Sequence, residues 1–176
     1  MKTYIVTLMM LLMSIGSFAQ NDDDAAFENF LHGWNYLFGI SGSPQDFNKA
    51  VEYFSTVANT NNSFAKNAKA ELGYCYFHGL GVPKNRQKAV EYFQKAASNP
   101  DADEFAQLYL SYFYHEGLYV KKDMQLSNYW AKQCSEYFTQ ENYTKYINEL
   151  LSPDIRFRNV KQKIDNTIQQ FINQGY

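Results

Sequence analysis

The feature that most constrains this chain is a sequence pattern that recurs after 38 residues. A segment that begins at Leu72-Gly73 and another that begins at Leu110-Ser111 share residue types in the same order. The matching positions are Ala68/Ala106, Leu72/Leu110, Tyr76/Tyr114, Gly79/Gly117, Val82/Val120 and Lys84/Lys122. A looser third copy lies upstream, with Gly33, Tyr36, Gly39, Lys49, Ala50, Tyr53 and Phe54. Self-similarity at this period is typical of arrays in which each repeat buries its apolar face against the next. Such arrays usually bind other molecules and do not catalyse reactions.

Apolar residues spaced three and four apart, separated by turns rich in glycine and proline, predict pairs of antiparallel helices. The expected pairs span residues 27–37 with 45–57, 64–78 with 86–97, and 103–115 with 124–138. Gly79 and Gly81 are expected to end one helix, because glycine accepts a left-handed backbone. Asn85 and Asp123 are expected to cap the second helices of their pairs. The predicted fold class is therefore all-α, an α-α superhelix of about three helical hairpins.

The repeat pattern stops after Phe138, and the rest of the chain is also predicted to be helical. One helix is expected over 141–151, and Ser152-Pro153 supplies the start of another. This last helix carries an apolar stripe of Phe157, Val160, Ile164, Ile168, Phe171 and Ile172. The favoured interpretation is a capping helix over the open end of the stack, which repeat arrays require. The alternative is a detachable helix that binds a partner or a membrane surface, although its polar face is not strongly basic.

The N-terminus has the organisation of a cleaved secretory signal peptide. Lys2 precedes an apolar run from Tyr4 to Met13, and Ser17-Phe18-Ala19 follows. The run is too short to span a bilayer, which takes about 20 residues, so no membrane span is expected after cleavage. An uncleaved anchor is the alternative. The expected domains are a signal peptide (1–19), an acidic lead-in (20–27), a repeat array (28–137, with repeats of about 28–63, 64–101 and 102–137) and a C-terminal helical cap (138–176).

Composition argues against several classes of function. The 16 basic and 18 acidic residues leave a net charge of −2, which is too near neutral to favour nucleic acid as a partner. The two cysteines, Cys75 and Cys134, are expected on helices that do not face each other directly, so both are predicted to be reduced and buried. No His-x-x-x-His or Cys-x-x-Cys spacing occurs, so neither a metal nor a cofactor is predicted.

One rival hypothesis involves catalysis. Cys75 and His78 lie one helical turn apart, a spacing that would allow a thiol hydrolase. No third residue is evident that would orient the histidine, so the chain is predicted not to be an enzyme.

The combined spacing of these repeats resembles the Sel-one-like repeat (SLR) family, a relative of the tetratricopeptide repeats. The residues that carry the resemblance are Ala68, Leu72-Gly73, Tyr76, Gly79-x-Gly81-Val82, Lys88-Ala89, Tyr92 and Lys95-Ala96-Ala97. The resemblance covers roughly residues 28–135. It implies a right-handed superhelix of helix pairs and a role in protein–protein interaction, adaptor work or assembly. Because many bacterial members are exported, it also agrees with a periplasmic or extracellular location.

In tetratricopeptide-like arrays the first helix of each pair lines the concave face. If Leu72, Gly73 and Tyr76 pack inward, Tyr74 should point towards that face, with Phe77 one turn further on. The predicted partner-binding residues are Trp34, Leu37, Tyr74, Phe77, Tyr112 and His115. A protein or peptide is the predicted partner, since Trp and Tyr are favoured at binding surfaces. Two alternatives remain: the rings pack between neighbouring helices, or they stack on peptidoglycan or another glycan.

Overall fold

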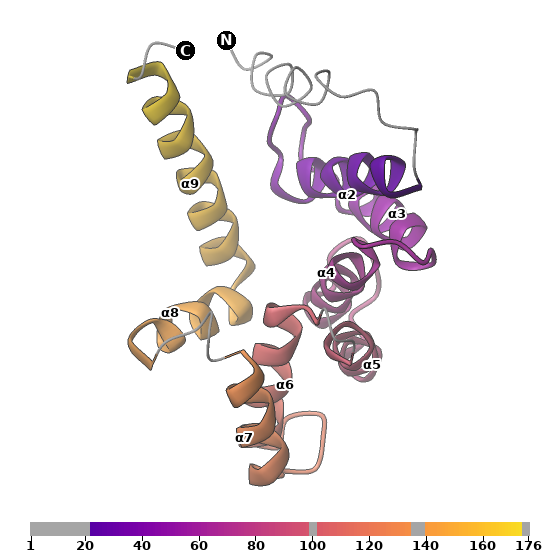
Figure 1. Cartoon of the computed structure of the whole chain (residues 1–176), viewed down its shortest axis with the longest axis vertical. Coiled ribbons are helices and arrows are strands. Elements are labelled where there is room, and N and C mark those ends of the chain that lie inside the picture. Colours follow the sequence, from indigo (N-terminus) through magenta and orange to yellow (C-terminus); the bar gives the residue numbers. More distant parts are fainter. Residues whose placement is uncertain (1–21, 99–101, 135–139, 174–176) are drawn as a thin grey trace.

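The computed structural model describes residues 22–98, 102–134 and 140–173. Three helical hairpins follow one another: α2 (Asp22–Phe38) with α3 (Phe47–Ala58), α4 (Ala65–His78) with α5 (Arg86–Ala97), and α6 (Glu104–Glu116) with α7 (Met124–Gln133). Two further helices complete the described chain, α8 (Gln140–Leu151) and α9 (Pro153–Asn173). No β-strand occurs among the described residues, and the predicted all-α fold class is confirmed. Figure 1 shows the hairpins along a curved path, with α8 and α9 on one side of it.

The hairpins stack in the order expected of a repeat array. The second helix of each hairpin packs against the first helix of the next, α3 on α4 and α5 on α6. One buried cluster joins the first two hairpins around Phe54 and Leu72, and another joins the last two around Phe93 and Phe113. Each hairpin thus buries apolar surface that it could not bury alone.

Local signals set the ends of the helices. Gly79 and Gly117 end α4 and α6 in the left-handed conformation, with φ of 80° and 72°. Asn85 caps α5 by accepting the backbone N–H of Lys88 at 2.9 Å, and Asp123 caps α7 in the same way. The predicted turns and caps are confirmed at these positions.

Close approach between helices depends on glycine. A Cβ at Gly33 would lie 2.6 Å from the ring of Phe54, and a Cβ at Gly73 would lie 2.7 Å from the ring of Phe93. In the third hairpin Ser111 occupies the equivalent position. There the residue that corresponds to Phe93 is Ala131, so the larger side chain on the first helix accompanies a smaller one on the second.

The first helix begins earlier than predicted. Residues 20–27 were expected to form an acidic lead-in, but α2 already starts at Asp22. Carboxylates are stabilised in the first turn of a helix by its dipole, and Asp23 also accepts a hydrogen bond from the backbone N–H of Ser63 at 3.1 Å. The predicted signal peptide (1–19) lies outside the described residues.

The C-terminal helices cap the array from the side of its first helices. α8 packs against α6, and α9 packs against α2. The sequence had suggested the open end of the stack as the place of the cap, but these contacts belong to the side on which α2, α4 and α6 lie. Within the predicted apolar stripe, Phe157 and Val160 pack on the array, whereas the side chains of Ile168, Phe171 and Ile172 lie outside the described residues.

Candidate partner-binding face

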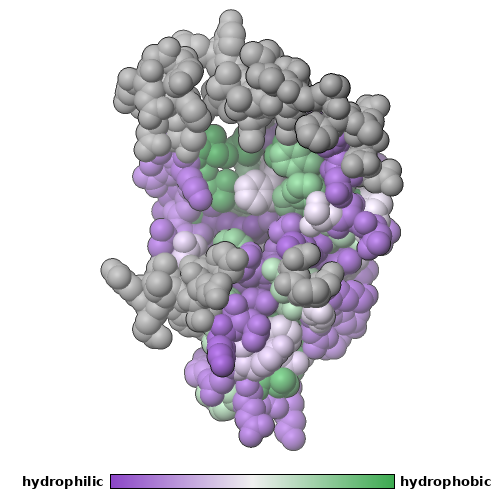
Figure 2. Space-filling model, viewed as in Figure 1, coloured by the Kyte–Doolittle hydropathy of each residue, from purple (hydrophilic) through white to green (hydrophobic). Residues whose placement is uncertain are grey.

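The first helices of the three hairpins carry all six residues that the sequence predicts to bind a partner. We call the surface of α2, α4 and α6 on the side of α8 and α9 the inner face. Trp34, Glu71 and Tyr74 lie on it, and Tyr112 occupies the equivalent repeat position on α6. Figure 2 shows apolar surface in the upper half of the molecule, between α9 and the first hairpin.

Three of the six residues are buried. Leu37 is 0 % exposed and belongs to the core of the first hairpin. Phe77 is 7 % exposed and packs on Tyr109 and Phe113 of α6, so the alternative of rings packed between helices holds for it. Tyr74 is 1 % exposed, which corrects the expectation that it stands on an open face. Two causes are visible: Tyr74 belongs to the core cluster shared with α5 and α6, and the Arg156 guanidinium of α9 lies 4.1 Å from the centre of its ring.

The other three residues retain exposed surface. Trp34 is half-buried, and its indole Nε1 donates a hydrogen bond to Glu71 Oε1 at 3.1 Å. Tyr112 is half-buried against the core of the last two hairpins. His115 is exposed, with Nδ1 2.7 Å from a carboxylate oxygen of Glu116. The structure therefore places Trp34 beside Glu71 and Tyr74 beside Arg156 of α9, and it leaves Tyr112 and His115 accessible on α6. A binding role for all six remains a prediction.

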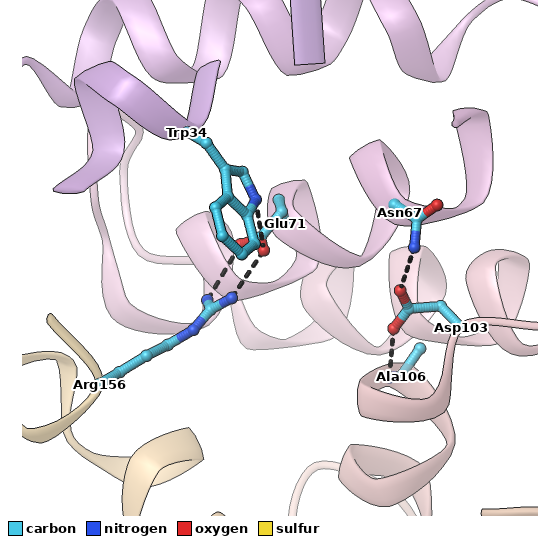
Figure 3. Close-up of polar contacts among 6 residues, drawn as sticks. All are labelled: Trp34, Asn67, Glu71, Asp103, Ala106 and Arg156. Atoms are coloured by element: carbon cyan, nitrogen blue, oxygen red, sulfur yellow. Dashed lines mark hydrogen bonds and ion pairs between the residues drawn. The ribbon is translucent and has the colours of Figure 1, made fainter. Parts of the chain in front are cut away.

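The centre of the inner face is an ion pair that sequence reasoning missed. Arg156 of α9 donates to both carboxylate oxygens of Glu71 on α4, over 2.6 and 2.9 Å (Figure 3). Both residues are buried, with 8 % and 6 % of their surface exposed. The one sequence feature that could have indicated this pair is a charged residue directly before an apolar one in each helix. These are Glu71 before Leu72 and Arg156 before Phe157.

Electrostatics favour the charged form of Arg156. Burial alone would lower the pKa of Arg156, but the charge of Glu71 and its hydrogen bonds outweigh that effect, so the pKa is raised. Burial raises the pKa of Tyr74, and the positive charge of Arg156 offsets only part of this rise. The guanidinium therefore remains charged between a carboxylate and the faces of two rings, Tyr74 and Phe38, the latter 5.4 Å away.

A second buried carboxylate lies between α4 and α6. Asp103 accepts hydrogen bonds from the backbone N–H of Ala106 and from Asn67 Nδ2, both at 2.9 Å (Figure 3). Burial raises the pKa of Asp103 to about 7. Asp103 thus caps α6 and joins two successive first helices through one side chain.

The cysteines are free and buried, as predicted. Burial raises the pKa of the Cys75 thiol, which disfavours the thiolate that a thiol hydrolase requires. Among the described residues, no three His, Cys, Asp or Glu side chains are grouped so that they could hold a metal ion. Within the same residues, no helix combines the length and the apolar character needed to cross a membrane.

Stacked hairpins of this kind, with a further helix against their first helices, define a helical-repeat protein. The family model for the Sel1 repeat matches residues 29–59, 67–101 and 105–135, which amount to more than half of the chain. The chain belongs to the Sel1 repeat family, and the predicted resemblance is confirmed.

Known proteins resemble part of this chain. An Arabidopsis thaliana protein, the ERAD-associated E3 ubiquitin-protein ligase component HRD3B, is 39 % identical over 97 residues; these make up 53 % of this chain but 14 % of that protein. A protective antigen of uropathogenic Escherichia coli strains with an SLR fold superposes with a TM-score of 0.55 at 29 % identity, over 63 % of this chain and 22 % of the antigen. A Sel1 repeat protein from Oxalobacter formigenes superposes with a TM-score of 0.54 at 25 % identity, over 71 % of this chain and 98 % of that one.

Proposed function

We propose that this protein is a non-enzymatic scaffold that binds another protein through its inner face. Sel1 repeats generally mediate protein–protein interaction, and a family member with three such repeats is suited to that task. The observation that carries the proposal is that the inner face already binds a helix, α9, through Glu71 and the rings beside it. A surface that recognises one helix by charge and by aromatic contact has the properties needed to recognise another.

The accessible part of the inner face gives the proposal a direct test. Tyr112 and His115 lie on α6 and are not covered as Tyr74 is. We expect a tagged protein, purified from the cells that make it, to retain a specific protein that the Tyr112→Ala/His115→Ala variant loses. Glu91→Ala, an exposed change on the second helix of the middle hairpin, is the matched control and should retain that protein. Equal retention by all three forms would exclude the inner face as the binding surface.

The proposal includes export to the periplasm or the exterior of the cell. Its support is the arrangement of Lys2, the apolar run after it and the small residues that end at Ala19. Fractionation and N-terminal sequencing test this part separately: the mature chain should begin at Gln20 and leave the cytoplasm. A full-length chain in the cytoplasm would contradict export without affecting the proposed binding.

Exposed rings support glycan binding as a second candidate. Tyr129 on α7 is 52 % exposed and Phe105 on α6 is 37 % exposed, and aromatic faces stack on sugars. Co-sedimentation with purified cell-wall sacculi distinguishes this candidate from the first. Binding to sacculi that Tyr129→Ala weakens would favour a glycan partner.

A further inference from the structure

The surroundings of Glu71 form a site built for a guanidinium group. Glu71 lies on α4 with Trp34 donating to one of its oxygens, so the carboxylate is held in one orientation. Its two oxygens accept a two-point hydrogen bond from Arg156, and the Tyr74 and Phe38 rings flank the cation. A planar guanidinium satisfies all these contacts at once, whereas the ammonium of lysine cannot make the two parallel bonds.

The helix that supplies this arginine makes its described contacts with the hairpins near its start. Arg156 enters the site, and Phe157 packs between Phe38 and Phe47 with ring centres 5.4 and 5.9 Å away. Val160, one turn later, packs on the same cluster. Beyond this point, Lys161, Gln162, Lys163, Asp165 and Asn166 are exposed. Local opening of one terminal helix costs less free energy than global unfolding.

Opening would return Glu71 to water. The ion pair covers the carboxylate, so detachment of α9 hydrates both charges and leaves neither buried alone. The hydroxyl of Tyr74, whose ring faces the guanidinium, is buried and has no hydrogen-bond partner among the described protein atoms. An incoming helix that carries an arginine at the same place can therefore repeat the contacts of Arg156.

We propose that the inner face binds a partner helix on which an arginine is followed by an aromatic residue, and that α9 occupies this site until such a helix displaces it. The inference rests on the proposed function and names the chemistry of its partner. The occupant is a segment of another protein. The charge of Glu71 selects its arginine, and the rings of Phe38 and Phe47, against which Phe157 packs, select its aromatic residue.

The test uses the full chain and a synthetic peptide with its own sequence from Ser152 to Asn173, titrated by calorimetry. The Arg156→Ala chain, whose α9 has lost its anchor, should bind this peptide at least ten times more tightly than the unmodified chain does. Arg158→Ala, an exposed change on the same helix, is the matched control and should behave like the unmodified chain. Phe157→Ser provides a second way to loosen α9 without leaving Glu71 unpaired, and it should raise peptide affinity in the same direction.

Variants of the peptide test whether the site prefers arginine. Replacing its first arginine by lysine (R156K) should weaken binding at least tenfold, and the same change at its second arginine (R158K) should leave the affinity unchanged. Glu71→Gln combined with Arg156→Ala in the chain should abolish the preference for arginine. Equal binding of the R156K peptide, or the failure of both loosened chains to bind any peptide, would overturn the inference.

Failure of the arginine site can be distinguished from failure of the proposed function. A chain that ignores the peptide but still loses its cellular partner through Tyr112→Ala/His115→Ala is a scaffold without the arginine site. A chain that binds the peptide but retains its cellular partner in that variant has the site and a different binding surface for the partner.

Discussion

Arg156 and Glu71, 85 residues apart in the chain, meet through two hydrogen bonds of 2.6 and 2.9 Å. This contact links the C-terminal helix to the first helix of the middle hairpin. The pairing of these two side chains fixes the position of α9 on the array.

The first prediction concerns the stability that this pair contributes. Arg156→Ala should lower the free energy of unfolding by about 1–3 kcal/mol, which is less than the roughly 3–5 kcal/mol lost when one partner of a permanently buried pair is removed. The smaller loss is expected because detachment of α9 hydrates Glu71. Urea denaturation at pH 7 measures it. The Glu71→Ala/Arg156→Ala double variant should lose little more than Arg156→Ala does; losses that add would show that the two side chains act independently.

The second prediction concerns the contact between Gly73 and Phe93. A methyl group at position 73 would meet the Phe93 ring at 2.7 Å, so Gly73→Ala should cost about 1–3 kcal/mol of stability through overpacking. In the Phe93→Leu background the ring is gone, and the same glycine change should cost clearly less. Thermal and urea unfolding of the four chains provides the comparison, and an identical cost in both backgrounds would contradict the packing explanation.

The third prediction separates backbone strain from contact between repeats. Gly81 has φ of 68°, and its Cβ would lie 2.2 Å from the carbonyl oxygen of Phe47 in the preceding hairpin. Gly42 has φ of 82° but no atom within 4 Å of its Cβ. Gly42→Ala should therefore cost only the strain of a left-handed residue, about 1–2 kcal/mol, and Gly81→Ala should cost more because the backbone of α3 must also move. Equal losses of stability for the two substitutions would show that the close approach of Gly81 to Phe47 does not affect stability.

The fourth prediction follows from Asp103. Its pKa of about 7 in the folded chain lies above the value near 3.9 of an unfolded aspartate, so the folded state binds the proton more tightly. The stability that this proton contributes is fully present below about pH 4 and is lost as the pH rises through 7. Each unit of the difference is worth roughly 1.4 kcal/mol.

Asp103→Asn tests the assignment because asparagine still caps a helix but does not ionise. The variant should lose this decline of stability between pH 4 and 7, and at pH 8 it should be as stable as the unmodified chain or more stable. Asp123→Asn, which changes the cap of α7, is the control and should keep the decline. A decline that persists in Asp103→Asn would assign it to another group.

Much of the repeat array could be predicted from the sequence because its signals are local. Gly79 and Asn85 specify a helix end and a helix start within seven residues, and the spacing of Ala89 and Phe93 defines the apolar side of α5. The start of α2 was harder, since an acidic run suits both a solvated segment and the first turn of a helix.

The inner face could be predicted only in part. The spacing from Tyr74 identified the helices that α8 and α9 pack against, but Tyr74 is also covered by Arg156, which comes from a distant part of the chain. An apolar stripe shows which side of a helix is buried and does not show the surface that buries it. The surface that α9 packs against is set by the pairing of Arg156 with Glu71. Sequence periodicity carries no information about such a pairing.

The most direct test of the account is where the cellular partner touches the array. A photoreactive phenylalanine in place of Tyr112, on the inner face, should cross-link to a specific protein in the cells that make this chain. The same group in place of Glu91, on an exposed side of α5, should give no such product. A product at position 91 with none at position 112 would contradict the claim that the first helices of the hairpins form the binding surface.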